Sequence, residues 1–271
     1  MILKPLFSFR SSAEAPQKLD VAIGLSAKLA SYVIVDAVAG NPVELSFFEI
    51  DNWNQNTVSA FLDHFSAHSE YSSVQVSYAS PQHTLLPISK YEKIALQNQL
   101  QLTFPFQPNS ILLQESYADW QFYLGYLVPA TIFKAVESKF PACQIKHSFK
   151  SMFNNLPANN LSNTIFIEVG IQQLDLLVFR AGQLVFCGTF QYTTEQDALY
   201  FLLKICQEYS FELTEVRLQL SGLIDYSSKL YAELSSYFLN VTFRTNSKDW
   251  TLTNYPSHYF TLLTNSLPCV S

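Results

Sequence analysis

The chain has 271 residues, of which 48% are hydrophobic and 14% charged, enough for two ordinary domains or one large one with a substantial core. Its net charge of -6, without any dense run of Lys and Arg, argues against a nucleic-acid partner. The longest apolar region (120–133) is too short for a membrane helix, and the segment 1–15 lacks the apolar core of a secretory signal. The four cysteines are far apart in the chain. We therefore expect a cytoplasmic protein with free thiols that spans no membrane.

The first part of the chain predicts three strands, a helix and a returning strand. Alternating or continuous apolar residues indicate the strands, and the segment 39–42 has the composition of a turn. Asp51 and Asn52 are the expected caps of a helix, since apolar residues follow at helical spacing. The predicted strands are residues 21–27, 32–38, 43–50 and 74–78, and the helix carries Val58, Phe61, Leu62 and Phe65 on one side.

Further α/β elements are predicted between residues 87 and 156. Pro129 fits the first turn of a helix that ends at Lys139. The Asn- and Pro-containing segment 154–163 is the best candidate for a domain boundary, so we expect a first lobe at 1–156 and a second at 157–271. The other predicted elements are helices at 87–100 and 149–156 and strands at 111–117, 121–128 and 143–147.

The second half repeats the pattern of the first. Gly40 and Gly182, in corresponding turns, are 142 residues apart, and the same offset aligns Ile23 with Ile165. Thr194 and the acidic residues after it form a capping-box-like helix start. We therefore predict two copies of one folding unit, with a ligand cleft between two facing lobes. The predicted strands are 165–169, 174–179, 184–190 and 216–220, with a helix over 198–209.

Three stretches carry a resemblance to a known family. They are YLVPATIFKAVESKFP with the downstream KHSF, FRAGQLVFCGTFQYTTEQDALYFLLKICQEYSFE, and LQLSGLIDYSSKLYAEL. They resemble a bacterial family of unknown function, known chiefly from Bacteroidetes, with an actin-like ATPase fold. The resemblance implies an α/β fold with a duplicated actin-like (ribonuclease H-like) two-lobe architecture and mixed sheets.

The resemblance also implies a nucleotide site in the second lobe. In active members of the superfamily an acidic residue followed by Gly positions magnesium, and backbone N–H groups hold phosphate oxygens. Glu168 and Gly170 match that pattern, Gln172 lies in the same turn, and Gly222 retains one glycine of the adenosine motif. These four are the implied cofactor-binding residues, with ATP and Mg²⁺ as the cofactors. Two alternatives stay open: Gly222 also suits a strand-to-helix turn, and Glu168 also suits a carboxylate that binds neighbouring N–H groups.

The first lobe lacks the corresponding residues. The offset of 142 places Ser26 and Lys28 where the acid and the glycine are expected, and Asp36 is the nearest carboxylate from that side. We therefore favour a non-catalytic actin-like protein that acts as a scaffold or interaction component, with a protein partner of unidentified kind. The alternative is a nucleotide-binding ATPase or small-molecule kinase that uses the cleft between the lobes.

Histidines are the remaining candidates for chemistry. His64 and His68 are four residues apart on a predicted helix, a spacing that suits a metal, but Phe65 stands where a zinc protease has Glu. A solvated helix end is the better interpretation, and no metal site is predicted. His147 lies near the predicted crossing between the lobes, where we expect a hydrogen bond between lobes rather than catalysis.

Overall fold

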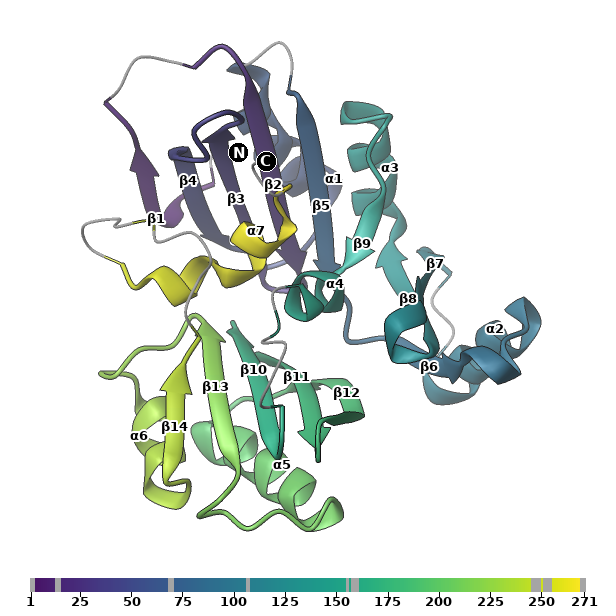
Figure 1. The fold of residues 1–271 in the computed structure, drawn as a ribbon. Helices are drawn as coiled ribbons and strands as arrows, with labels where there is room; N and C mark the ends of the chain where they lie inside the picture. The colour runs from purple at the N-terminus through teal and green to yellow at the C-terminus, as the bar shows by residue number, and fades with distance from the viewer. Residues whose placement is uncertain are drawn as a thin grey trace. The chain divides into compact units, whose positions relative to one another are not determined.

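The computed structural model describes residues 3–12, 16–67, 71–105, 108–154, 156, 161–244, 250 and 255–268. The chain divides into two compact units, each with its own mixed sheet (Figure 1). Unit 1 comprises Met1–Lys150 and Ser266–Ser271, and unit 2 comprises Ser151–Asn265. The predicted lobe limits at 156 and 157 stay a prediction, because several residues around them lie outside the described part of the chain.

Unit 1 is built on a six-stranded sheet in the order β1-β4-β3-β2-β5-β9. Strands β2, β3 and β4 form the predicted antiparallel meander, and β5 returns parallel to β2. An unpredicted strand, β1, pairs antiparallel with the outer side of β4. The bounds are β1 Pro5–Arg10, β2 Leu19–Ser26, β3 Leu29–Asp36, β4 Pro42–Glu49, β5 Ser73–Ala79 and β9 Ile145–His147.

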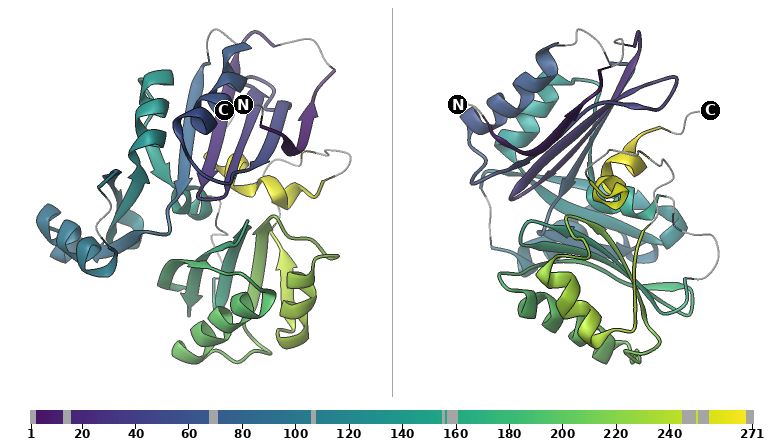
Figure 2. Two further views of the ribbon diagram at one scale, coloured as in Figure 1. Left: turned by 180° about the vertical axis from the view of Figure 1, so that it is seen from behind. Right: turned by 90° about the vertical axis from the view of Figure 1, so that its left-hand side faces the viewer.

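Two helices, α1 (Gln55–Leu62) and α3 (Ala130–Lys139), contact each other beside this sheet (Figure 2). The predicted caps Asp51 and Asn52 are wrong: the Asn54 side chain accepts the N–H of Thr57, because the chain turns into the helix only after residue 54. A 3-10 helix, Asp63–Ala67, continues α1. The sheet and α1 enclose an aromatic cluster that is almost fully buried: Tyr32, Phe48, Phe61 and Phe65.

A small antiparallel sheet in the order β6-β8-β7 completes unit 1, together with helix α2. The predicted helix over 87–100 begins only at Lys93, because His83–Pro87 pairs with β8 as strand β6 and Ile88–Lys90 forms a short 3-10 helix. Pro129 stands at the N-cap of α3, immediately before its first residue. The bounds are α2 Lys93–Thr103, β7 Ser110–Tyr117, β8 Phe122–Pro129 and α4 Ser148–Phe153, with a 3-10 helix at Ala118–Trp120.

Unit 2 repeats the central strand order of unit 1, as β12-β11-β10-β13-β14. The meander is antiparallel, and β13 returns parallel to β10. Helix α5 (Glu195–Glu208) starts with the predicted capping box, formed by Thr194 and Asp197. The other bounds are β10 Thr164–Gly170, β11 Gln173–Arg180, β12 Gln183–Gln191, β13 Arg217–Gly222, α6 Lys229–Tyr237, β14 Asn240–Phe243, a 3-10 helix Ser257–Phe260 and α7 Thr261–Ser266.

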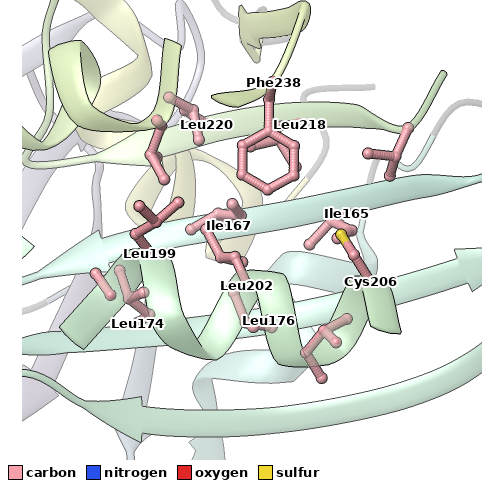
Figure 3. Close-up of a cluster of buried hydrophobic side chains, with 14 of the residues drawn as sticks. Ile165, Ile167, Leu174, Leu176, Leu199, Leu202, Cys206, Leu218, Leu220 and Phe238 are labelled. Carbon is pink, nitrogen blue, oxygen red and sulfur yellow. The ribbon is translucent and has the colours of Figure 1, made fainter. Parts of the chain in front are cut away.

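The core of unit 2 lies between its sheet and helices α5 and α6 (Figure 3). Alternate residues of β10 and β13 face the helices, and Leu202 of α5 packs among them with no exposed surface. This alternation leaves the other residues of each strand, Glu168 and Ser221 included, on the opposite face of the sheet. The labelled members in Figure 3 are Ile165, Ile167, Leu174, Leu176, Leu199, Leu202, Cys206, Leu218, Leu220 and Phe238.

The two units agree in their parallel strands and differ in one hairpin. Ile23 pairs with Val76 and Ile165 pairs with Leu218, the same separation in both units and in line with the predicted offset. Across the first hairpin Ile23 pairs with Tyr32, nine residues later, whereas Ile165 pairs with Val178, thirteen residues later. The single ungapped offset is therefore wrong in the second strand, because the hairpin of unit 1 is shorter.

Candidate functional site

The predicted phosphate residues of unit 2 lie at the tip of the hairpin between β10 and β11. Glu168 is the third-last residue of β10, Gly170 ends the strand, and Gly170 pairs with Gln173 across a tight turn. Gln172, in that turn, has a φ of 55°, a left-handed conformation that is uncommon for a residue with a side chain. A Cβ at Gly170 would lie 3.6 Å from its nearest neighbour, the Gln173 carbonyl oxygen, so this position has room.

The Glu168 side chain points into the protein and is satisfied there. It is only 7% exposed, and its Oε2 accepts a hydrogen bond from Ser221 Oγ at 2.5 Å. Burial raises the pKa of Glu168 to about 8, although the Ser221 hydrogen bond and the Arg244 charge act in the opposite direction. The carboxyl group is therefore mostly protonated at neutral pH, which is the wrong form for holding Mg²⁺.

Gly222 packs directly against this carboxyl group. Its φ of +84° is in the left-handed region, and an added Cβ would lie 2.3 Å from the carbonyl oxygen of Val169 and 2.8 Å from Oε1 of Glu168. The N–H of Leu223 donates to the same carbonyl at 2.7 Å, which holds the turn after β13 against β10. The glycine is thus explained by close approach of two backbones as well as by its backbone angle.

A row of polar side chains that the sequence analysis missed crosses the sheet at Glu168. Glu168 pairs with Asp175 of β11 and with Ser221 of β13, and Asp175 pairs in turn with Thr189 of β12. Asp175 accepts hydrogen bonds from Thr189 Oγ1 at 2.6 Å and from Gln173 Nε2 at 3.1 Å. The one signal in the sequence was a single carboxylate, Asp175, among the apolar residues in the middle of strand β11.

Arg244 is the second group that sequence reasoning missed. It follows β14, is 7% exposed, and lies with its guanidinium 5.1 Å from the centre of the Phe166 ring. Its Nη1 has no hydrogen-bond partner among the described residues. Burial lowers the pKa of Arg244, and the nearby Glu168 opposes that shift. Nothing in the pattern around an isolated arginine after a short strand indicates that it will be buried.

The corresponding hairpin of unit 1 is closed on itself. Ser26 Oγ accepts the N–H groups of Leu29 at 3.1 Å and Lys28 at 3.3 Å. The Ser26 carbonyl accepts the indole N–H of Trp53 at 2.7 Å, and the Lys28 carbonyl accepts the N–H of Ile50 at 2.9 Å. Ser26 pairs with Ala79, as Glu168 pairs with Ser221. The N–H groups of Lys28 and Leu29, two of the backbone donors that a phosphate could use here, are therefore bonded within the protein itself.

Asp36 does not reach this hairpin. It pairs with Leu19, at the opposite end of β2 from Ser26. Its Oδ1 accepts the N–H groups of Val38 at 2.8 Å and Ala39 at 3.1 Å. Asp36, the nearest carboxylate that the sequence offers from that side, instead stabilises the turn at the other end of the strand.

The histidine candidates have structural surroundings. His64 lies in the 3-10 helix after α1, against the rings of Tyr32 and Phe48, while His68 lies outside the described residues. His147 is fully buried, with Nε2 3.1 Å from the Ser80 carbonyl oxygen and Nδ1 accepting the N–H of Phe149. Both of these bonds lie within unit 1, so they are not the predicted bond between lobes.

The described part of the chain contains no group of three or more His, Cys, Asp or Glu side chains placed to hold a metal ion. None of its helices is long and apolar enough to cross a membrane.

Solved structures with the same fold support the two-lobe architecture. A protein of unknown function from Bacteroides thetaiotaomicron, described as having an actin-like ATPase fold, matches with a TM-score of 0.70 and 18% identity, over 84% of this chain and 91% of that one. The ethanolamine utilization protein EutJ from Carboxydothermus hydrogenoformans matches with a TM-score of 0.50 and 9% identity, over 98% of this chain and 91% of that one. A chain of the PilM-PilN type IV pilus biogenesis complex matches with a TM-score of 0.51 and 10% identity, over 93% of this chain and 98% of that one.

These likenesses establish an actin-like α/β fold and leave the activity open, since all the identities are low. No curated protein matches the sequence. The profile of one family, described as a protein of unknown function (DUF3822), matches residues 10–241. Because that match spans most of the chain, the protein belongs to the DUF3822 family.

Proposed function

We propose that this protein is a non-catalytic member of the actin-like fold that acts through its surfaces, as a scaffold or interaction component. The observation that carries the proposal is the state of Glu168, the one acidic residue that matches a phosphate-loop position. It is buried, hydrogen-bonded to Ser221, and has a pKa raised to about 8. A neutral carboxyl group turned into its own sheet is poorly suited to position Mg²⁺.

The hairpin of unit 1 supports the same proposal. Its N–H groups at Lys28 and Leu29 are bonded to Ser26 Oγ, and its carbonyls are bonded to Trp53 and Ile50. Binding a phosphate here requires breaking internal hydrogen bonds, each worth about 1 kcal/mol. A structural neighbour described as part of a pilus biogenesis complex is compatible with a role in assembly on this fold.

The second candidate is a nucleotide-binding ATPase or small-molecule kinase that uses Glu168, Gly170, Gln172 and Gly222. One observation favours it: Nη1 of the buried Arg244, close enough to Glu168 to influence its pKa, has no described partner and suits an anionic group. The room at Gly170 is compatible with a ligand that approaches the hairpin. For this second candidate function, Glu168 must lose its proton when the ligand binds, because only the ionised carboxylate can hold Mg²⁺.

Thermal-shift titration with Mg-ATP and Mg-ADP separates the two candidates. A non-catalytic protein is expected to keep the same melting temperature at millimolar nucleotide, because a ligand stabilises only when it binds the folded state. A Gly170→Trp variant is the matched control, since it fills the space at the hairpin tip. A rise in the melting temperature of the wild type that the Gly170→Trp variant lacks would refute the non-catalytic proposal and support the nucleotide site.

A further inference from the structure

Strand β12 is an unprotected sheet edge. It is the last strand of the unit 2 sheet, and no described strand pairs with its outer side (Figure 1). With nine residues it is the longest of the described strands, and it contains neither a charged residue nor a proline. Exposed edge strands are normally very short or contain charged residues or prolines, and these features prevent pairing with other chains. β12 has none of these three protections, and its pairing with β11 is irregular only at Val185; β4 has the same irregularity at Val43 and still pairs with β1.

The equivalent edge of unit 1 has an additional strand. β4 occupies the same place in the shared strand order as β12, and β1 covers its outer side in antiparallel orientation. An ion pair between Arg10 and Glu44, with Nη2 and Oε2 2.5 Å apart, joins the two strands at their ends. The protein therefore shows, in its own unit 1, that this edge of the fold accepts one more antiparallel strand.

Aromatic rings border the uncovered edge. The Phe186 ring lies across the strand at Gly188, where an added Cβ would be 2.3 Å from its Cζ. Phe186 stacks with Phe190 at 5.8 Å between ring centres, and Phe190 stacks with Phe201 of α5 at 4.6 Å. Tyr200 extends this row and is 55% exposed. The row gives the edge an apolar margin that a paired strand would cover.

The charges around β12 indicate which strand would pair with it. Arg180, which is exposed, stands beside the start of β12, and the acidic residues Glu195 and Asp197 open α5 after its end. When two copies of β12 pair antiparallel, the start of each strand, with Arg180 beside it, lies toward the end of the other strand, with its acidic residues. The middle parts of the two strands carry no charge and therefore do not repel each other. This edge is thus complementary to itself.

We propose that two copies of this chain associate through antiparallel pairing of their β12 strands, which joins the two unit 2 sheets into one continuous sheet around a twofold axis. The pairing does not depend on whether nucleotide binds.

Analytical ultracentrifugation of the full chain tests the pairing. The wild type is expected to sediment as a dimer whose fraction rises with concentration. The double substitution L184K/Q191K adds lysines to two residues of β12 that are accessible to solvent, and a symmetric pair then carries four of them along its seam. Like charges across the seam are expected to raise the dissociation constant at least about tenfold.

Thr242→Lys is the matched control, because Thr242 is exposed on β14, the opposite edge strand of the same sheet. It is expected to leave the dimer intact, and thermal unfolding checks that each variant is folded. A wild type that stays monomeric at all concentrations overturns the proposal. A dimer that survives L184K/Q191K, or one that Thr242→Lys disrupts instead, also overturns it, because the contact then lies on another surface.

Discussion

The two sheets share a strand order but differ in their first hairpin and in whether their outer edge strand is covered. In unit 1 the hairpin is short and bonded to itself through Ser26, and the edge strand β4 is covered by β1. In unit 2 the hairpin is longer and ends beside the buried Glu168, and the edge strand β12 is uncovered. The two copies of the folding unit therefore differ in this hairpin and at this edge, and unit 1 also has the small sheet β6-β8-β7, while the parallel strand pairs of the core are the same in both.

Backbone hydrogen bonds and apolar packing explain why the core strands pair in the same way in both units. The parallel pairs β2–β5 and β10–β13 are held by backbone bonds and apolar side chains, and these tolerate many sequences of similar volume. Hairpin tips and edges lie outside that packing, so changes there cost little stability. The hairpin tip and the outer edge strand can therefore differ between the units while the core pairing is kept.

The largest expected effect is at Gly222. Gly222→Ala combines a left-handed φ with a Cβ that would collide with the Val169 carbonyl, and we expect a loss of about 4 kcal/mol in the free energy of unfolding. Gly182→Ala is the matched control, because Gly182 has a φ of +81° but open space, so about 1 kcal/mol is expected there. Urea denaturation measures both, and equal losses would contradict the close-packing explanation.

The next effect is a dependence of stability on pH that comes from Glu168. Its folded-state pKa of about 8 lies above the ordinary value, so the folded protein holds a proton that the unfolded chain releases. The stabilising contribution is complete below about pH 4.5 and is lost as the pH rises through 8, by up to about 1.4 kcal/mol per pH unit.

Glu168→Gln removes this titration and keeps an oxygen that accepts the Ser221 hydrogen bond. Urea denaturation of both proteins from pH 5 to pH 9 is expected to show the variant gaining stability relative to the wild type as the pH rises. Glu212→Gln, at an exposed glutamate in unit 2, is the control and is expected to leave the profile unchanged. Parallel profiles for the wild type and Glu168→Gln are incompatible with a protonated Glu168.

A smaller effect is expected at the hairpin of unit 1. Ser26→Ala removes the acceptor for the N–H groups of Lys28 and Leu29 and is expected to cost about 1 kcal/mol. Ser8→Ala, at an exposed residue of β1, is the control and should fall within about 0.5 kcal/mol of the wild type. If Mg-ATP instead stabilises the Ser26→Ala variant against unfolding, the N–H groups freed by the substitution bind phosphate. The Ser26 hydroxyl is then the only group that prevents phosphate binding at this hairpin.

The smallest effect concerns the ion pair that joins β1 to β4. Arg10 is 74% exposed on its side chain, so Arg10→Ala is expected to cost no more than about 0.5 kcal/mol. Screening by salt weakens exposed ion pairs, and the difference from the wild type should shrink in concentrated sodium chloride. A large loss that salt does not change would mean that packing of the arginine stem, rather than its charge, holds β1 in place.

Much of the fold could be predicted because its signals are local. The alternation in β2, β10 and β13 and the capping box at Thr194 depend on residues a few positions apart. The start of α2 was predicted too early because segment His83–Pro87 becomes a strand only by pairing with β8, 35 to 43 residues further on. Strand β1 was missed although Phe7 and Phe9 alternate with Ser8 and Arg10, because the alternating stretch is short and the strand is held by pairing with β4, which lies more than thirty residues further on.

The candidate site, like the fold, could be predicted from the sequence only in part. The motif placed Glu168, Gly170 and Gln172 on one hairpin, and the structure brings Gly222 against Glu168. The neighbours that determine the chemistry of Glu168 lie on other strands: Ser221 is bonded to it, and Asp175 and Arg244 influence its pKa. No spacing in the chain indicates that these side chains meet.

The repeated strands of the two units, the turns at Gly40 and Gly182 and the start of α5 could be predicted from the sequence, because the period of the apolar residues and the conformational demands of turns act over a few residues. The burial of Glu168 with a raised pKa, the closing of the unit 1 hairpin by Ser26 and the uncovered edge of β12 could be seen only in the folded structure. The physical reason is that burial, charge and edge exposure depend on which strands become neighbours, and those neighbours are far apart in the chain.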